Sequence, residues 1–404
     1  MHCNLKAMEQ LFDYQEKIFS SATPLLDRYL EKKIDWGSRL IAIKGARGAG
    51  KTSLLIKYIR SAFNNDPAAL YVSLDHLYFS NNSLLDFADS FQKKGGMILF
   101  LDEVHKYPNW SQEIKNIYDA FPNLKLVITG SSILDILKGK GDLSRRVMIY
   151  DLQGLSFREY LSFETGIPFE AFSLDEILKN HRNISREIVG QIKPFEHFSN
   201  YLQHGYYPFY KEGINAYPSR LMNVINLTLE SDLPLLRNVD QKYIPRLKKL
   251  LYMIAVSAPV QPNISKISQL IETSRNTVQL YLEHLCDARL INLSRSAKSG
   301  YALLSKPEKI YLHNTNLSYI LANDKPNTGN LRETFFYNQA GVNHEIHSPS
   351  AGDFIVNGQF TFEIGGKSKK EEQIKKVKDA YIIADDIEFG YEHKIPLWLM
   401  GFLY

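Results

Sequence analysis

Residues 45–52 read Gly45-Ala46-Arg47-Gly48-Ala49-Gly50-Lys51-Thr52, and the fold of the chain follows from this stretch. It matches the phosphate-binding loop pattern G-x-x-x-x-G-K-[ST] at every fixed position. The run Arg39–Lys44 before it indicates a short buried strand, and Ser53–Phe63 after it carries apolar residues at helical spacing. The pattern therefore has the strand–loop–helix context in which it holds phosphates. A glycine-rich turn that binds nothing is the alternative.

Each part of the loop has a predicted role toward a nucleotide. Glycines let successive N–H groups turn toward phosphate oxygens, and the helix N-terminus adds the positive end of a dipole. Lys51 is expected to reach the β- and γ-phosphates, and Thr52 to hold Mg²⁺ through its hydroxyl. The predicted cofactors are ATP and Mg²⁺, and the predicted nucleotide-binding residues are Gly45, Ala46, Arg47, Gly48, Ala49, Gly50, Lys51, Thr52 and Ser53.

Length and composition limit the number of domains and the classes of protein to which the chain can belong. The chain has 404 residues, of which 44% are apolar and 23% charged, an ordinary globular balance for two to four domains. A net charge of +4 permits an anionic partner without requiring one. Two distant cysteines, Cys3 and Cys286, favour a reducing compartment. With no secretory signal and no apolar run of membrane-spanning length, we expect a cytoplasmic protein without a membrane partner.

A second motif follows about fifty residues after the loop. The apolar run Met97–Leu101 leads into Asp102 and Glu103, the form of a Walker B strand buried on both faces. Ligands bind at the carboxyl ends of such strands in open parallel sheets. Asp102 is therefore predicted beside Mg²⁺, and Glu103 as the general base that polarises the attacking water. A core strand that ends in a solvated turn is the alternative.

The next predicted strand, Lys125–Thr129, ends in Gly130-Ser131-Ser132. A hydroxyl there can contact the γ-phosphate or the attacking water, and the spacing does not choose between Thr129 and Ser131. The alternative is a plain helix N-cap by Ser131 or Ser132.

A pair of arginines, Arg145 and Arg146, precedes a fifth predicted strand at Met148–Leu152. An arginine in this place can act on the γ-phosphate of a neighbouring subunit, which would make the protein a homo-oligomer. An arginine pair on the surface is the alternative.

One strand, Leu70–Ser73, lies between the loop strand and the Walker B strand, which fits the additional-strand P-loop ATPases. The runs Ile98–Trp110, Val127–Ser132 and Leu152–Leu161 resemble the AAA+-related prokaryotic ATPases. That resemblance implies an N-terminal P-loop domain followed by a nuclease-like domain of unassigned function. It also implies a helical lid after Ser156–Tyr160.

A glycine-to-proline turn at Gly205–Pro208 is similar to the lid motif of signal-transducing ATPases, with Tyr206 in place of the usual second glycine. A helix-ending turn is the alternative. The predicted fold class is α/β: a P-loop parallel sheet of the additional-strand type with lid, winged helix and a small α/β nuclease-like domain. The predicted boundaries are a helical segment at 1–37, the ATPase domain at 38–155, the lid at 156–243, the winged helix at 244–324 and the nuclease-like domain at 325–404.

Three amphipathic segments predict the winged helix: Arg246–Ser257, Ile264–Ile271 and Arg275–Leu290. Ile291–Arg295 and Tyr301–Ser305 are expected to pair as the wing. Ser274 is expected to cap the third helix, which would bring four side chains to a DNA major groove. These are Arg275, Asn276, Thr277 and Gln279. Contact with double-stranded DNA and packing against protein stay open as alternatives.

Glu333, Asp353 and Glu363 occur in the order of a PD-(D/E)xK nuclease core, in which carboxylates hold a divalent metal and a lysine assists water. Gly365 stands where that lysine belongs, and Lys367 lies two residues further on. A bulge at Gly365-Gly366 would bring Lys367 back toward the carboxylates. A decayed nuclease fold kept for binding or assembly is the favoured interpretation.

Three functions are consistent with these motifs. ATP hydrolysis with Mg²⁺ would drive a conformational change, with DNA as one candidate partner. A slow ATP-dependent switch that controls assembly would use the same loop. An active metal-dependent nuclease would depend on Lys367.

Overall fold

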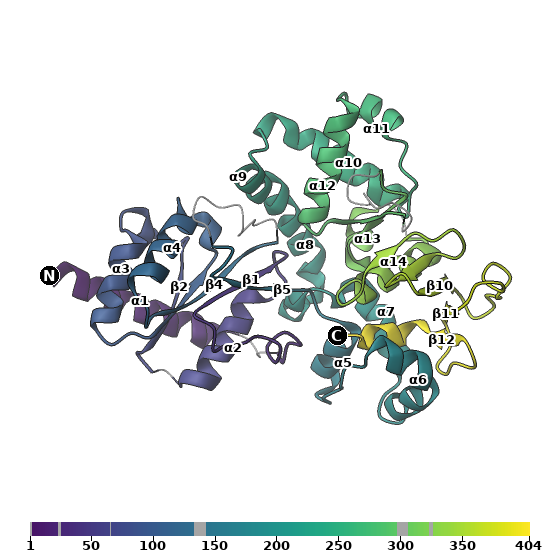
Figure 1. Cartoon of the computed structure of the whole chain (residues 1–404), viewed down its shortest axis with the longest axis horizontal. Coiled ribbons are helices and arrows are strands. Elements are labelled where there is room, and N and C mark those ends of the chain that lie inside the picture. Colours follow the sequence, from purple (N-terminus) through teal and green to yellow (C-terminus); the bar gives the residue numbers. More distant parts are fainter. Residues whose placement is uncertain (1, 23–25, 65, 133–142, 297–305, 323–325) are drawn as a thin grey trace. The chain divides into compact units, whose positions relative to one another are not determined.

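The computed structural model describes residues 2–22, 26–64, 66–132, 143–296, 306–322 and 326–404 (Figure 1). The chain divides into two compact units, Met1–Gln153 and Gly154–Tyr404, and each is described by itself.

The first unit is built on a five-stranded parallel sheet in the order β2-β3-β4-β1-β5. Four strands are apolar and almost wholly buried, as strands covered on both faces must be. β4 lies between the loop strand β1 and the Walker B strand β3, so the predicted α/β fold with an additional-strand P-loop sheet is confirmed. The strands are β1 (Leu40–Gly45), β2 (Ala69–Ser73), β3 (Ile98–Asp102), β4 (Lys125–Ser131) and β5 (Met148–Leu152).

Helices connect and cover these strands: α1 (His2–Ser21), α2 (Lys51–Phe63), α3 (Leu84–Lys93) and α4 (Trp110–Ala120). α1 and α2 contribute Phe19, Leu55 and Ile59 to one core cluster with residues of β1, β2 and β3. The prediction that residues 1–37 are helical is right only in part. α1 ends at Ser21, and residues 29–38 form turns on the same cluster.

A side chain of α1 forms a hydrogen bond with the free backbone edge of strand β2. The Gln15 amide oxygen, on α1, accepts a hydrogen bond from the Tyr71 N–H at 2.7 Å. Gln15 is 5% exposed, so this bond is shielded from water. An edge strand otherwise presents unpaired N–H groups, and Gln15 satisfies one of them.

The second unit begins with helices and short helical turns, of which two, η3 (Tyr201–Gly205) and η6 (Thr228–Asp232), are π-helical. The α-helices are α5 (Phe157–Thr165), α6 (Leu174–Val189), α7 (Pro194–Asn200), α8 (Tyr217–Leu227), α9 (Leu233–Arg237), α10 (Ile244–Ser257), α11 (Ile264–Leu270), α12 (Arg275–Asp287) and α13 (Thr315–Leu321). The glycine-to-proline turn lies between η3, which ends at Gly205, and η4 (Pro208–Glu212). It ends a helix, and its Tyr206 is buried.

The three helices predicted for the winged helix are α10, α11 and α12, and the Ser274 hydroxyl caps α12 by accepting from the Thr277 N–H at 3.1 Å. The first strand predicted for the wing is β6 (Ile291–Ser294), which pairs antiparallel with β7 (Lys309–Leu312). That partner differs from the predicted one, Tyr301–Ser305, which lies outside the described residues.

A mixed sheet in the order β12-β11-β10-β9-β8 completes the second unit. Its strands are β8 (Ile346–His347), β9 (Phe354–Val356), β10 (Phe360–Gly365), β11 (Ala380–Ala384) and β12 (Lys394–Pro396). β9 and β10 form the predicted hairpin, and β10 runs parallel to β11. α14 (Thr328–Ala340) packs on this sheet through Phe336, whose ring lies 5.2 Å from that of Phe354 and 5.1 Å from that of Phe362. Among the described helices, none combines the length and the apolar character that a bilayer-spanning segment requires.

Candidate nucleotide site

The phosphate-binding loop joins the end of β1 to the start of α2. Gly48 and Gly50 have φ angles of 80° and 95°, a left-handed conformation that glycine adopts without strain. A Cβ at Gly45 would lie 2.5 Å from the Leu152 carbonyl oxygen on β5, so no larger residue fits there. The fixed glycines of the motif are thus required by turn geometry and by the close approach of β5.

Lys51 is the first residue of α2, and its side chain folds back into the phosphate-binding loop. Its side chain is buried, and its ammonium donates to the carbonyl oxygens of Gly45 at 3.0 Å and Ala46 at 3.2 Å. A buried ammonium needs such acceptors, because an unpaired charge away from water is strongly unfavourable. The loop carbonyls therefore hold the positive charge at the place where the motif predicts the phosphates.

Thr52 and Asp102 come together although fifty residues separate them. The Thr52 hydroxyl donates to Asp102 Oδ2 at 2.6 Å, and the Tyr71 hydroxyl on β2 donates to the same oxygen at 2.8 Å. Asp102 Oδ1 accepts from the Thr129 hydroxyl on β4. Three elements thus fix this carboxylate, and burial together with the Asp102 charge holds the Tyr71 pKa well above its usual range.

Glu103 follows Asp102 in a left-handed conformation, with φ of 54°. Its N–H donates to the Thr129 hydroxyl at 3.2 Å. Its carboxylate Oε2 lies 3.3 Å from His105 Nε2 and 4.0 Å from Arg47 of the loop. Glu103 is therefore directed toward the loop, as a general base would be, and it already has basic neighbours.

Thr129 and Ser131 lie near the same end of β4. The Thr129 hydroxyl bonds to Asp102, the last residue of β3, and to the N–H of Glu103 after it, whereas Ser131 is the last residue of β4 and lies in register with Gly45. Ser131 thus belongs to a strand. The choice between the two hydroxyls for contact with a γ-phosphate stays a prediction.

Arg145 and Arg146 precede β5 and lie at the opposite end of the sheet. β5 runs parallel to β1, with Met148 beside Ile41 and Leu152 beside Gly45. At about 3.3 Å per residue, the start of β5 is more than about 10 Å from the loop. Arg146 is held by Asp119, with its Nε 3.0 Å from Oδ1, whereas Arg145 is exposed. Neither arginine reaches the loop of its own chain.

Two residues of the site were not predicted. Tyr71 holds Asp102, as described above. The buried Arg28 guanidinium donates to the carbonyl oxygen of Ala49 in the loop and to that of Gln153 after β5, each at 2.7 Å. Arg28 therefore fixes the loop against the neighbouring strand. No motif marks it, whereas Tyr71 lies in a strand that the apolar pattern did predict.

The second unit brings together the three carboxylates predicted from the nuclease pattern. Lys309 of β7 lies 3.3 Å from Glu333 and 3.7 Å from Asp353, and the Tyr311 hydroxyl donates to Glu333 at 2.9 Å. Burial raises the pKa of Glu333 and of Glu363, and the nearby Asp353 charge adds to both shifts.

The lysine that pairs with Glu363 is Lys369, not the predicted Lys367. Lys369 Nζ pairs with Glu363 Oε1, whereas Lys367 is exposed and its carbonyl oxygen accepts from Lys394 Nζ at 2.6 Å. β10 ends at Gly365, so the chain leaves the strand and turns before Lys369 returns to Glu363. Within the described residues, no group of three or more histidine, cysteine, aspartate or glutamate side chains has the arrangement of a metal site.

The predicted DNA-contacting residues lie in the first turns of α12. Arg275, Asn276 and Gln279 are exposed, and Thr277 is half-buried with its hydroxyl 2.9 Å from that of Ser274. All four residues thus lie at the start of α12, as predicted, and three of them are exposed to solvent. Their contact with DNA stays a prediction.

Comparison with protein families gives two matches. Residues 37–161 match a model described as an AAA domain, and residues 195–328 match one described as a domain of unknown function (DUF8612). The first match spans the phosphate-binding loop and the Walker B strand. It supports an AAA-type P-loop ATPase domain with a nucleotide-binding function.

Among curated proteins, the chain is similar to the uncharacterized protein MJ1637 of Methanocaldococcus jannaschii, with 28% identity over 268 residues and 63% of this chain covered. The match spans 55% of the length of that relative. Among solved structures, AMPPCP-bound DnaA from Aquifex aeolicus is similar at 15% identity and a TM-score of 0.26, covering 63% of this chain and 84% of that one.

The ORC1 protein of Aeropyrum pernix, solved in complex with DNA, is similar at 12% identity and a TM-score of 0.30, covering 80% of this chain and 92% of that one. At TM-scores this low, these likenesses say nothing of function.

Proposed function

We propose that this protein binds Mg-ATP at residues 45–53 and hydrolyses it. The observation that carries the proposal is the 2.6 Å hydrogen bond from the Thr52 hydroxyl to Asp102. It joins the two groups that the motifs assign to Mg²⁺, at the end of the sheet where β1 and β3 present their carboxyl ends. The match of residues 37–161 to an AAA domain supports the same function.

The residues fit Mg²⁺ in the way that nucleotide sites hold it. This ion takes one or two protein oxygens and completes its shell with phosphates and water. Thr52 Oγ1 would be the direct ligand, and Asp102 would orient that hydroxyl and the bound water. When bound, Mg²⁺ would neutralise charge on the phosphate oxygens.

The chain's own residues have distinct tasks in this mechanism. Lys51 would exchange its carbonyl partners for phosphate oxygens, because an ion pair stabilises the buried ammonium more than neutral carbonyls do. Glu103 would accept a proton from the attacking water. His105 and Arg47 hold the Glu103 carboxylate in the present arrangement, so turnover would require one of these contacts to loosen.

Nucleotide binding is tested by Lys51→Ala. Loss of the loop's ammonium should weaken binding of Mg-ATP at least about tenfold, measured by calorimetry, with unchanged thermal unfolding of the free protein. Lys57→Ala is the control on the same helix, because its ammonium pairs with Asp27 and Glu31 outside the loop. Equal affinity of Lys51→Ala and the parent would contradict the proposal.

DNA association is a second candidate function, favoured by the exposed Arg275, Asn276 and Gln279 at the start of α12. We also propose that the carboxylate cluster of Glu333, Asp353 and Glu363 has no nuclease activity, because the Lys309 ammonium pairs with both Glu333 and Asp353 and so takes the place that a divalent metal would need. One experiment tests both: the protein is incubated with Mg-ATP and double-stranded DNA. Faster phosphate release with intact DNA is expected. An unchanged rate contradicts DNA association, and metal-dependent cleavage contradicts the decayed site.

A further inference from the structure

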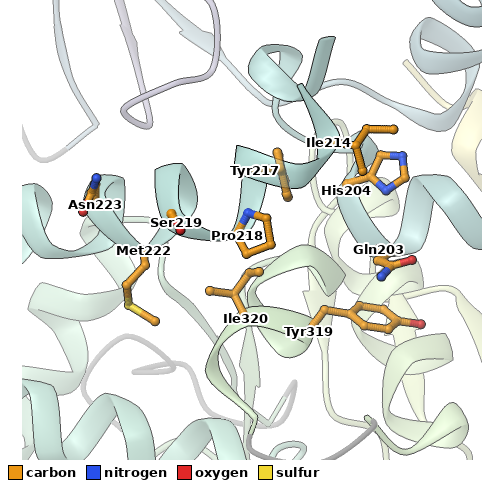
Figure 2. Close-up of a pocket in the computed structure, with 10 residues that line it drawn as sticks. All are labelled: Gln203, His204, Ile214, Tyr217, Pro218, Ser219, Met222, Asn223, Tyr319 and Ile320. Carbon is orange, nitrogen blue, oxygen red and sulfur yellow. The ribbon is translucent and has the colours of Figure 1, made fainter. Parts of the chain in front are cut away.

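The second unit contains a cavity of about 520 Å³, formed by η3, η5 (Ile214–Ala216), α8 and α13 (Figure 2). This volume lies in the range of small-molecule sites, about 300–1,000 Å³. All of its lining residues fall within residues 195–328, the part that matches a domain of unknown function. The cavity therefore belongs to one unit of the chain and is separate from the nucleotide site.

A π-helical turn sets one wall of the cavity. η3 carries Gln203 and His204, and its backbone is held by Asn316 of α13. The Asn316 amide donates to the carbonyl oxygens of Tyr201 at 3.0 Å and Leu202 at 2.9 Å, and its oxygen accepts from the Tyr206 N–H at 2.9 Å. Such turns interrupt the regular helix and occur frequently at functional sites.

The same asparagine fixes a second wall. Asn316 Oδ1 accepts from the hydroxyl of Tyr217, the first residue of α8, at 2.6 Å. Tyr319 and Ile320, which also line the cavity, follow Asn316 on α13. Because Asn316 is fully buried, the three walls are joined by bonds that water does not weaken. The cavity is thus a preformed site.

His204 gives this site its chemistry. It is 7% exposed and packs against the rings of Tyr160, Tyr210 and Tyr217. His204 is one of the residues that line the cavity, so its imidazole can meet a ligand there (Figure 2). Burial lowers the pKa of His204, so at neutral pH the ring offers one N–H donor and one acceptor.

The remaining lining residues select the class of ligand. Ile214, Pro218, Met222 and Ile320 form apolar surface, and Ile214 is 58% exposed although it is a large hydrophobic residue. Among the described residues that line the cavity, none is lysine, arginine, aspartate or glutamate. Polar groups come only from neutral amides, hydroxyls and the imidazole, which suit a ligand without net charge.

We propose that this cavity binds a small uncharged nitrogen heterocycle. Its flat apolar face would cover Pro218, Met222 and Ile320, and its hydrogen-bonding edge would meet His204 and Gln203. The cavity contains no residue of the phosphate-binding loop. Ligand binding there can therefore be tested independently of the proposed ATPase activity.

The test uses nicotinamide and benzimidazole as neutral probes and nicotinate as a charged probe of the same size. Binding to the full chain is followed by the imidazole resonances of His204, assigned with His204→Gln. Both neutral probes should saturate the site with Kd below about 1 mM, and nicotinate should bind at least about tenfold more weakly. Equal binding of nicotinate, or no saturable response to the neutral probes, would overturn the proposal.

Variants at exposed positions of α8 identify the cavity as the place of binding. Ser219→Trp fills the cavity from its rim and should weaken both neutral probes at least about tenfold. Leu227→Trp, on the same helix but outside the cavity, should leave their affinity unchanged. Asn223→Trp serves as a second filling variant if Ser219→Trp alters thermal unfolding. Unchanged affinity in a folded filling variant would overturn the assignment.

Discussion

At the scale of single residues, Glu103 tests the chemistry most directly. Glu103→Gln keeps the shape of the side chain but removes the proton acceptor, so turnover should fall at least about 100-fold while Mg-ATP affinity stays near that of the parent. Phosphate release and calorimetric binding measure the two effects. Glu272→Gln is a matched control. Glu272 also has φ of 54°, but it follows α11 in the second unit and is not part of the nucleotide site. Turnover of Glu103→Gln within twofold of the parent would remove Glu103 from the mechanism.

Glu333 gives a pH dependence with a definite sign. Burial and the Asp353 charge raise the pKa of Glu333 above its ordinary value of 4.5, so folding disfavours its ionised form. Below pH 4.5 the group is protonated in both states and no penalty applies; above its raised pKa the penalty is complete. The stability of Glu333→Gln relative to the parent should therefore increase as pH rises from about 4.5 toward neutrality.

Urea unfolding at several pH values measures this difference. The same series in an Asp353→Asn background provides the control, because one cause of the raised pKa is then absent and the slope should shrink. A relative stability that is flat or falls with pH would show that Lys309 and Tyr311 stabilise the ionised form more than burial disfavours it.

Residue positions were predictable where a motif fixes both identity and spacing. Lys51, Thr52 and Asp102 lie together as the two motifs require. The nuclease pattern named Glu333, Asp353 and Glu363, which lie near one another, but it placed Lys367 beside Glu363, where the structure has Lys369. The prediction of Lys367 assumed that β10 continues past Gly365 with alternating side chains. The chain instead turns after Gly365, and this turn brings Lys369 to Glu363. Arg28 was missed because a hydrogen bond to a backbone carbonyl leaves no pattern in the sequence.

At the scale of elements, the edge of the first sheet depends on one side chain. Gln15→Ala should lower the free energy of unfolding by about 1 kcal/mol or more, because the buried Tyr71 N–H loses its acceptor. Gln10→Ala is the matched control on the exposed face of α1. Chemical unfolding of the full chain measures both. A Gln15→Ala variant as stable as Gln10→Ala would mean that another group satisfies the Tyr71 N–H.

Helices and buried parallel strands were predicted well because their signals are local. Apolar spacing and caps identified α10, α11 and α12, and continuous apolar runs identified β1 and β3. Pairing is not local. The sequence predicted a wing from neighbouring segments, but β6 pairs with Lys309–Leu312 beyond a longer connection. The turns at residues 29–38 were predicted as helix because their apolar residues, which serve the core of the first unit, also fit a helical period.

At the scale of the whole molecule, the arginines before β5 determine what to expect of assembly. Since neither reaches the loop of its own chain, a catalytic role for either requires a second subunit. If that role exists, Arg145 is the better candidate, because Asp119 holds Arg146. Phosphate release per chain should rise with protein concentration, and Arg145→Ala should lower it more than Arg146→Ala does.

Complementation distinguishes a shared site from general destabilisation. A mixture of Arg145→Ala and Lys51→Ala chains should recover part of the lost turnover, because one interface then combines an intact loop with an intact arginine. Turnover per chain that is independent of concentration, with no recovery in the mixture, would indicate that each chain works alone.

The fourfold bonding of Asn316 also has a consequence for biosynthesis. Tyr201, Leu202, Tyr206 and Tyr217 leave the ribosome about a hundred residues before their common partner does. At roughly 5–20 residues per second, that interval lasts about 5–20 s. During that interval, the π-turn lacks the hydrogen bonds to Asn316 that hold it in the complete chain. A chain that ends before Asn316 should therefore be unable to hold the turn and the start of α8 in the arrangement that forms the cavity.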